Sequence, residues 1–187
     1  RALFDLYLNK NDFNKSEFYL NKTIDLTKKL FGKESNEYID ILIQSTFLYS
    51  DLNNLEKFTK NLTEATRLTH SLSKKNDLLE FSISNTWALF YYKVGEYYNC
   101  IQELKKIIHF IESNPIHYNN SNSIAYYNSY IARVYFLIKD YKSALFHYKI
   151  CLELKIKNNE NEDVSLYLGI ASVYKEIGDL KNNNIYL

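Results

Sequence analysis

Apolar residues recur at three- and four-residue spacing along this chain, in paired segments separated by short polar breaks. The stretch 123–154 shows the pattern most clearly. Before its polar break, Ala132 and Tyr135 share one face of a helix; after the break, Ala144 and Tyr148 do the same. The spacing therefore predicts two amphipathic helices joined by a tight turn.

The same plan recurs upstream and downstream of this stretch. Each break contains an acidic residue, which can cap the second helix of its pair and favour the positive end of the helix dipole; these residues are Asp12, Asp51, Glu96, Asp140 and Asp179. For the second pair the pattern predicts the turn at Ser50-Asp51-Leu52. We expect five helix pairs, the last one partial, at approximately 1–31, 36–72, 77–113, 122–157 and 163–187.

The positions of small and aromatic residues in these pairs resemble the tetratricopeptide repeat (TPR) pattern. A small residue precedes an aromatic by three positions, and Ala precedes an aromatic by four, as in Ala132/Tyr135 and Ala144/Tyr148. The segment NTWALFYYKVGEYYNCIQELKKIIHF follows the same plan, with Ala88 in the first small position. The resemblance implies an all-α, right-handed α-solenoid of antiparallel helix pairs, a TPR-like superhelix, formed by one domain. Because the chain has no Met and opens on Arg1 within an apolar pattern, we expect it to be a fragment of a longer chain.

The spacing between the breaks exceeds the roughly 34 residues of an ordinary TPR. Long repeats with a linker such as LFGKESNEYIDILIQ are similar to those of kinesin light chains and of bacterial peptide-pheromone receptors. This resemblance implies a protein or peptide partner.

The composition fits a helical protein with a core and excludes several function classes. The chain has 46% hydrophobic and 24% charged residues, with four Gly and one Pro. The net charge is +1 and no Lys/Arg run exceeds a pair, which argues against nucleic-acid binding. No apolar run approaches the roughly 20 residues that span a bilayer. Lys outnumbers Arg by twenty to three, a bias typical of AT-rich genomes.

The residue pattern offers no catalytic, cofactor or metal site. The four His do not lie at zinc-ligand spacing from other ligand types, and no phosphate-binding or nucleophile motif is present. We therefore expect a chain that is not an enzyme and binds no cofactor. Cys100 and Cys151 fall in small-residue positions of second helices, so we expect buried thiols in a reducing, cytoplasmic environment.

The leading functional hypothesis is a non-catalytic scaffold that binds a peptide or helix in its concave groove. In a TPR array the first helices line this groove; the predicted lining is Gln44, Phe47, Asn85, Leu89, Tyr92, Lys93, Tyr126, Ser129, Arg133 and Phe136. The Lys and Asn set that binds chaperone C-terminal tails in related proteins is absent, which argues against that partner. Three alternatives stay open: a regulatory peptide receptor, a structural adaptor of a cytoskeletal or motor assembly, and a docking module appended to a catalytic domain.

Overall fold

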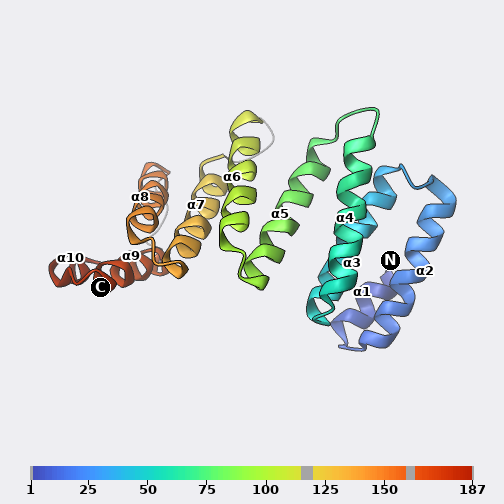
Figure 1. Cartoon of the computed structure of the whole chain (residues 1–187), viewed down its shortest axis with the longest axis horizontal. Helices are drawn as coiled ribbons and strands as arrows, with labels where there is room; N and C mark the ends of the chain where they lie inside the picture. Colours follow the sequence, from blue (N-terminus) through green and yellow to red (C-terminus); the bar gives the residue numbers. More distant parts are fainter. Residues whose placement is uncertain (1, 115–119, 159–162, 187) are drawn as a thin grey trace. The chain divides into compact units, whose positions relative to one another are not determined.

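The protein is all-helical in the part of the chain that its structure describes. This computed structural model describes residues 2–114, 120–158 and 163–186, in which there are ten helices and no strand. Arg1 and Leu187, at the ends of the first and last expected repeats, lie outside this range. The helices are α1 (Ala2–Asn9), α2 (Phe13–Phe31), α3 (Asn36–Asp51), α4 (Leu55–Ser71), α5 (Asp77–Val94), α6 (Tyr97–Ser113), α7 (Asn120–Leu137), α8 (Tyr141–Lys157), α9 (Val164–Glu176) and α10 (Leu180–Ile185) (Figure 1).

The chain divides into two compact units, Arg1–Trp87 and Ala88–Leu187, with the boundary inside α5. In the first unit α1 packs on α2, α2 on α3, and α3 on α4 (Figure 1). The indole N–H of Trp87 donates a hydrogen bond to the Thr66 hydroxyl (3.1 Å), which ties α5 to α4. The core of this unit includes the fully buried aliphatic residues Leu20, Ile39 and Leu62, together with buried aromatic residues such as Tyr49 and Phe58.

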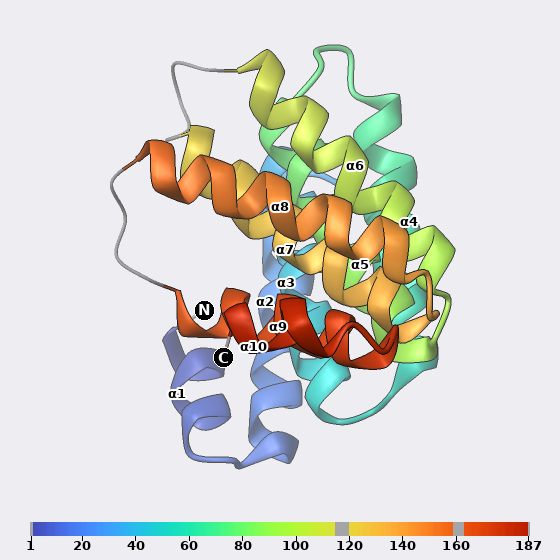
Figure 2. The same cartoon turned by 90° about the vertical axis from the view of Figure 1, so that its left-hand side faces the viewer.

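The second unit repeats the arrangement with neighbouring helices in contact. Helix α6 packs on α7, α7 on α8, α8 on α9, and α9 on α10 (Figure 2). Its core combines small and large side chains, because small residues let the helix axes approach and large ones fill the space beside them. One cluster contains Ala132, Ala144, Tyr148, Leu166 and Ile170.

All five helix pairs are joined by the same turn. One or two positions after each first helix stands a residue with a positive φ, and these residues are Asn11, Asn53, Gly95, Lys139 and Gly178. The next residue is the N-cap of the second helix, and its N–H bonds the carbonyl of a Tyr five positions earlier at 2.8–3.0 Å. This six-to-one bond is that of a Schellman motif. The five tyrosines are Tyr7, Tyr49, Tyr91, Tyr135 and Tyr174.

Four of the five N-cap side chains also accept a hydrogen bond from the second helix. Asp12, Asn54, Asp140 and Asp179 each accept the N–H three residues later, at 3.0–3.2 Å. Glu96 makes no such bond, and its carboxylate accepts from the Asn99 amide instead (2.6 Å). The shorter Asp and Asn side chains are therefore the ones that cap these helices.

The turn predicted at 50–52 is wrong by three residues. Helix α3 continues to Asp51, and Asn54 rather than Asp51 caps α4. Asn53 supplies the positive φ of 51°, a conformation that Asn tolerates better than most residues. With this correction the N-caps at 12, 54, 96, 140 and 179 lie 42, 42, 44 and 39 residues apart.

The small positions of the repeat are buried in both helices of each pair. Ala88, Ala132 and Ala171, eight residues before their N-caps, are buried as expected. Four residues after the caps stand Ser16, Phe58, Cys100, Ala144 and Asn183, all buried. The two most polar of these five are satisfied by the first helix: Ser16 donates to the Phe4 carbonyl (3.3 Å), and Asn183 donates to the Ala171 carbonyl (2.8 Å).

Candidate functional site

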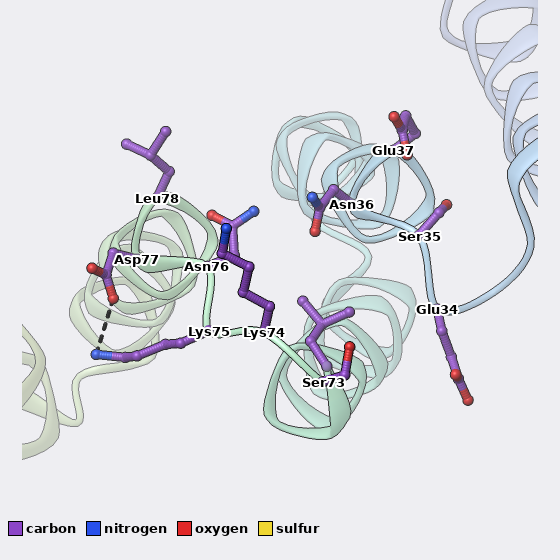
Figure 3. A pocket seen from close by; sticks show the side chains of 11 residues that line it. Glu34, Ser35, Asn36, Glu37, Ser73, Lys74, Lys75, Asn76, Asp77 and Leu78 are labelled. Atoms are coloured by element: carbon purple, nitrogen blue, oxygen red, sulfur yellow. Dashed lines mark ion pairs between the residues drawn. The ribbon is translucent and has the colours of Figure 1, made fainter.

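One hollow lies in the first unit, between the loop before α3 and the loop before α5 (Figure 3). Its volume is about 620 Å³. The lining residues are mostly polar and include Ser35, Asn36, Lys74, Asn76 and Asp77. None of them was singled out from the sequence.

Several polar groups of this hollow are used in forming its own loops. Ser35 accepts the Tyr38 N–H (3.1 Å), and Asn76 accepts the Leu79 N–H (3.2 Å), so both act as helix caps. Lys75 pairs with Asp77 (3.0 Å, the dashed line in Figure 3) and with Glu80 (3.2 Å). These ion pairs raise the pKa of Lys75. The hollow is thus a polar surface whose groups largely serve the backbone.

The second cavity lies in the second unit, against the first helices of successive pairs. It has a volume of about 230 Å³. Its walls come from α5, α7, α8 and α9, and the lining residues are Tyr92, Arg133, Phe136, Leu137, Tyr148, Gly169 and Ser172. Aromatic and aliphatic side chains predominate, with Arg133 as the one formally charged residue in this lining.

Gly169 and Tyr148 shape one wall of this cavity. A Cβ atom at position 169 would lie 2.7 Å from Cζ and 2.8 Å from the hydroxyl of Tyr148, so α9 can approach the phenol because residue 169 is Gly. Tyr148 is only 5% exposed. Within the described residues its hydroxyl has no hydrogen-bond partner. The oxygen itself is not fully buried, because it borders the open space of the cavity.

Arg133 provides the positive charge of the cavity. It is exposed, and among the described residues it makes no ion pair or hydrogen bond. Burial raises the pKa of Tyr148, and the Arg133 charge opposes this rise. Tyr130 responds in the same way: burial raises its pKa and Arg133 acts against it. The guanidinium is therefore close enough to both phenols to act on them electrostatically.

The remaining polar groups of the cavity are partly used. The Ser172 hydroxyl donates to the Leu168 carbonyl (2.7 Å), which leaves its oxygen as an acceptor. The Tyr92 ring packs edge-on against Tyr130, with centroids 5.5 Å apart, and this contact fixes the α5 wall. The donors at this cavity are thus the Arg133 guanidinium and the hydroxyls of Tyr92 and Tyr148.

The structure brings three of the predicted groove residues together here: Tyr92, Arg133 and Phe136. Leu89 and Lys93 lie on α5, and Tyr126 and Ser129 on α7, outside the cavity lining. Tyr126 is 62% exposed and packs edge-on against Tyr127.

The other three predicted groove residues, Gln44, Phe47 and Asn85, belong to the first unit. Because the turn after α3 lies three residues later than predicted, the position equivalent to Arg133 is Phe47 rather than Gln44. Phe47 is 49% exposed, whereas Gln44 is half-buried and donates to Asp40 on its own helix. Asn85 is half-buried. Asp40 and Ser50 take the positions of Tyr126 and Phe136 on this face.

Sequence reasoning missed Leu137, Tyr148, Gly169 and Ser172. One signal could have found Gly169: the other glycines, at 32, 95 and 178, have positive φ just after helices, whereas Gly169 lies inside α9. A glycine in a helix interior often marks a close approach of another element. Tyr148 carried no such signal, because its place in the apolar pattern is that of an ordinary core residue.

A polar cluster in the same unit contains His147, which is half-buried on α8. Its Nδ1 lies 2.8 Å from the buried Asn128 amide oxygen, and its ring stacks on Tyr135. Burial, assisted by the Lys105 charge, lowers the pKa of His147 to about 4. The imidazole is therefore neutral near pH 7 and serves the packing of α7 against α8.

Other site types find no support in the described residues. There, no three His, Cys, Asp or Glu side chains gather as metal ligands, and no helix has the length and apolar character needed to cross a membrane. Cys100 and Cys151 are buried, as expected, and form no disulfide with a described residue; burial raises the pKa of Cys100 to about 11. A thiol with so high a pKa is a poor nucleophile at neutral pH.

No family model and no curated protein matches the sequence. Solved structures do match the fold. BtubC (BKLC) from P. vanneervenii superposes with a TM-score of 0.80 at 14% identity, over 99% of this chain and 74% of that one. The TPR-like repeats of a putative kinesin light chain from Podosopora anserina give 0.75 at 10% identity, over 99% and 88%. The apo form of RapI gives 0.79 at 12% identity, over 98% and 64%. The chain thus has a TPR-like repeat fold, and at such low identity the similarity concerns the fold alone.

Proposed function

We propose that this chain is a non-catalytic protein-interaction scaffold that binds a peptide on the face formed by α5, α7 and α9 of its second unit. One observation carries the proposal: the cavity there joins an Arg without a partner in the described residues to aromatic walls. Aromatic residues and Arg are the types that dominate binding energy at protein interfaces.

The size of the cavity limits what it holds. Its volume of about 230 Å³ is below the roughly 300–1,000 Å³ of pockets for drug-sized ligands. It fits one residue of a peptide, and the rest of the peptide would lie along α5 and α7. There Leu89, Lys93, Tyr126 and Ser129 offer apolar and polar contacts.

A mixed peptide library tests this proposal without a known partner. Random decapeptides, half with free carboxyl ends and half amidated, are incubated with the full chain, and the bound peptides are identified by mass spectrometry. Fluorescent copies of the enriched peptides are then titrated against variants. We expect Arg133→Glu and Tyr92→Ala each to weaken binding by about tenfold or more, as for interface anchors.

Lys149→Glu is the matched control, because it makes the same charge change on an exposed position of α8 outside the cavity lining. It should leave affinity unchanged. The melting temperature of Arg133→Glu should stay close to that of the wild type, since most surface changes alter stability by less than about 0.5 kcal/mol. Enriched peptides that bind both cavity variants as well as the wild type would place binding elsewhere and overturn the proposal.

We further propose a cytoplasmic location, because two buried cysteines that form no disulfide suit a reducing compartment. Peptide or protein partners are the class proposed here. The near-neutral charge gives no reason to add nucleic acid, and the face lacks the Lys and Asn set of chaperone-tail binding.

A further inference from the structure

We infer that the cavity around Arg133 takes the side chain of a phosphorylated tyrosine at an internal position of the peptide. The phosphoryl group is bound by Arg133 and by the hydroxyls of Tyr92 and Tyr148. The phenyl ring lies against Phe136 and Leu137. This inference rests on the proposed peptide-binding function and names the residue type that the cavity selects. Three features lead to it: the donors, the apolar walls and the size of the cavity.

The donors at the cavity call for an anion with several acceptor oxygens. Arg133 comes from α7, Tyr92 from α5 and Tyr148 from α8. None of the three makes a hydrogen bond or an ion pair with another described residue. A phosphorylated side chain carries a charge of about −1.5 to −2 at pH 7 and three acceptor oxygens, one for each of these donor groups. The lining contains no acidic residue that would repel this charge.

The walls favour a ring beside the anion. Phe136, Leu137 and the ring of Tyr92 present apolar surface next to the Arg133 charge. Aromatic rings attract one another in offset and edge-on arrangements. A phosphorylated serine or an Asp supplies the anion without a ring, and an unmodified tyrosine supplies the ring without the anion. A phosphorylated tyrosine carries both on one side chain.

The size of the cavity matches one large side chain rather than a whole ligand. Its volume is about 230 Å³. A side chain at position 169 would meet the Tyr148 ring, so Gly169 lets α9 close the wall beside the phenol. The Arg133 charge acts on the same phenol, because it opposes the rise in the pKa of Tyr148 that burial causes. One phosphoryl group can therefore contact both side chains.

The test uses amino-acid probes blocked at both ends, titrated into the isotope-labelled full chain and followed by NMR at Gly169 and at the Arg133 side chain. The first probe, N-acetyl-O-phosphotyrosine amide, carries the ring and the phosphoryl group. N-acetyl-O-phosphoserine amide lacks the ring, and N-acetyl-tyrosine amide lacks the phosphoryl group. We expect saturable shifts with the first probe and affinities about tenfold or more weaker for the other two. Loss of a buried ring, or of a hydrogen bond to a charged group, is worth about this factor.

A fourth probe separates a phosphoryl group from the end of a peptide. N-acetyl-phenylalanine carries a ring and a free carboxylate, which offers two oxygens instead of three. It should bind about tenfold more weakly than the phosphotyrosine probe. Equal or tighter binding of this acid, of the phosphoserine probe or of the unmodified tyrosine probe would overturn the inference.

Variants separate the donors from general damage to the fold. Arg133→Gln, Tyr92→Phe and Tyr148→Phe should each weaken binding of the phosphotyrosine probe by about tenfold. Lys149→Gln, at an exposed position of α8 outside the lining, should not. The two Tyr→Phe changes should leave the melting temperature unchanged, because neither hydroxyl has a partner to lose among the described residues, and the ring at position 92 keeps its contact with Tyr130. Full affinity in any of the three cavity variants would overturn the inference.

A second decapeptide library distinguishes failure of this inference from failure of the proposed function. Its peptides are amidated, each has one central tyrosine, and half of them are phosphorylated there. Enrichment of the phosphorylated half, lost with Arg133→Gln, supports both. Arg133-dependent enrichment of both halves alike retains the peptide scaffold but overturns phosphotyrosine recognition. Absence of any enriched peptide in this library and in the first overturns both.

Discussion

At the scale of single residues, Lys139 carries avoidable backbone strain. Its φ is 63°, in the left-handed region, where the equivalent residues of two other turns are Gly. This conformation costs a residue with a Cβ roughly 1–2 kcal/mol. The greater flexibility of Gly in the unfolded chain offsets about 0.5–1 kcal/mol of that.

We therefore expect Lys139→Gly to raise the free energy of unfolding by about 0.5–1 kcal/mol in urea titrations. Lys149→Gly, within α8, is the control and should lower it by about 1 kcal/mol. A destabilised Lys139→Gly would mean that the Lys side chain makes contacts that outweigh the strain.

His147 makes stability depend on pH between about 4 and its ordinary pKa of 6.5. Because the folded pKa is the lower one, the unfolded chain binds the proton more readily in this window. Stability is thus fully present above 6.5 and is lost as pH falls toward 4. The groups that face His147 are Asn128, Tyr135 and Lys105, none of which is an acid that could stabilise the imidazolium.

Urea midpoints measured from pH 7 to 4.5 should fall for the wild type and fall less for His147→Gln. His109→Gln, at an exposed position of α6, should keep the wild-type dependence. The carboxylates with lowered pKa act mainly below their ordinary values, which are 3.8 for Asp163 and 4.5 for Glu64, so they contribute little above the lower end of this range. Identical pH profiles for the wild type and His147→Gln would contradict the neutral, buried imidazole.

At the scale of helices, the corrected turn after α3 can be tested with two neighbouring polar residues. Asn54→Ala removes the side chain that accepts the Lys57 N–H (3.0 Å), so we expect a loss of about 1 kcal/mol. Asp51→Ala, at the exposed last residue of α3, should change stability by less than about 0.5 kcal/mol. Thermal or urea unfolding of the two variants decides the point; a larger loss at Asp51 would restore the turn predicted from the sequence.

This turn also shows what the sequence could and could not predict. Helix pairs were predictable because three- and four-residue spacing is a local property of the chain. The second turn was misplaced because an acidic cap was expected at Asp51. In the structure Asn53 adopts the positive φ of the turn and Asn54 caps α4. That shift then moved Gln44 onto the predicted groove. Gly169 and Tyr148 escaped notice because their contact joins two different repeats and has no local signature.

At the scale of the whole molecule, damage to one repeat should remain near it. In repeat folds stability is approximately a sum of repeat terms and nearest-neighbour interfaces. Ala132→Leu overpacks a fully buried position of α7, at a typical cost of about 1–3 kcal/mol.

Hydrogen exchange read by mass spectrometry should therefore show lost protection in α7 and in its partner α8, with little change in α3 and α4. Lys142→Leu, at an exposed position of α8, should leave every helix protected as before. Uniform loss of protection along the chain would show that it unfolds as one cooperative block.

The five equivalent turns determine where this chain can change in length. In every helix pair, the segment from eight residues before the N-cap to four residues after it has the same spacing. The buried residues at its two ends and the hydrogen bond to the Tyr carbonyl both depend on this spacing. An insertion there would displace a buried side chain, whereas the loops between pairs are free of that requirement. The unequal spacings of 42, 44 and 39 residues agree with this. A protein engineer who needs a tag, a protease site or a second binding loop should place it at 33–34 or 73–75, where the chain can grow without altering its repeats.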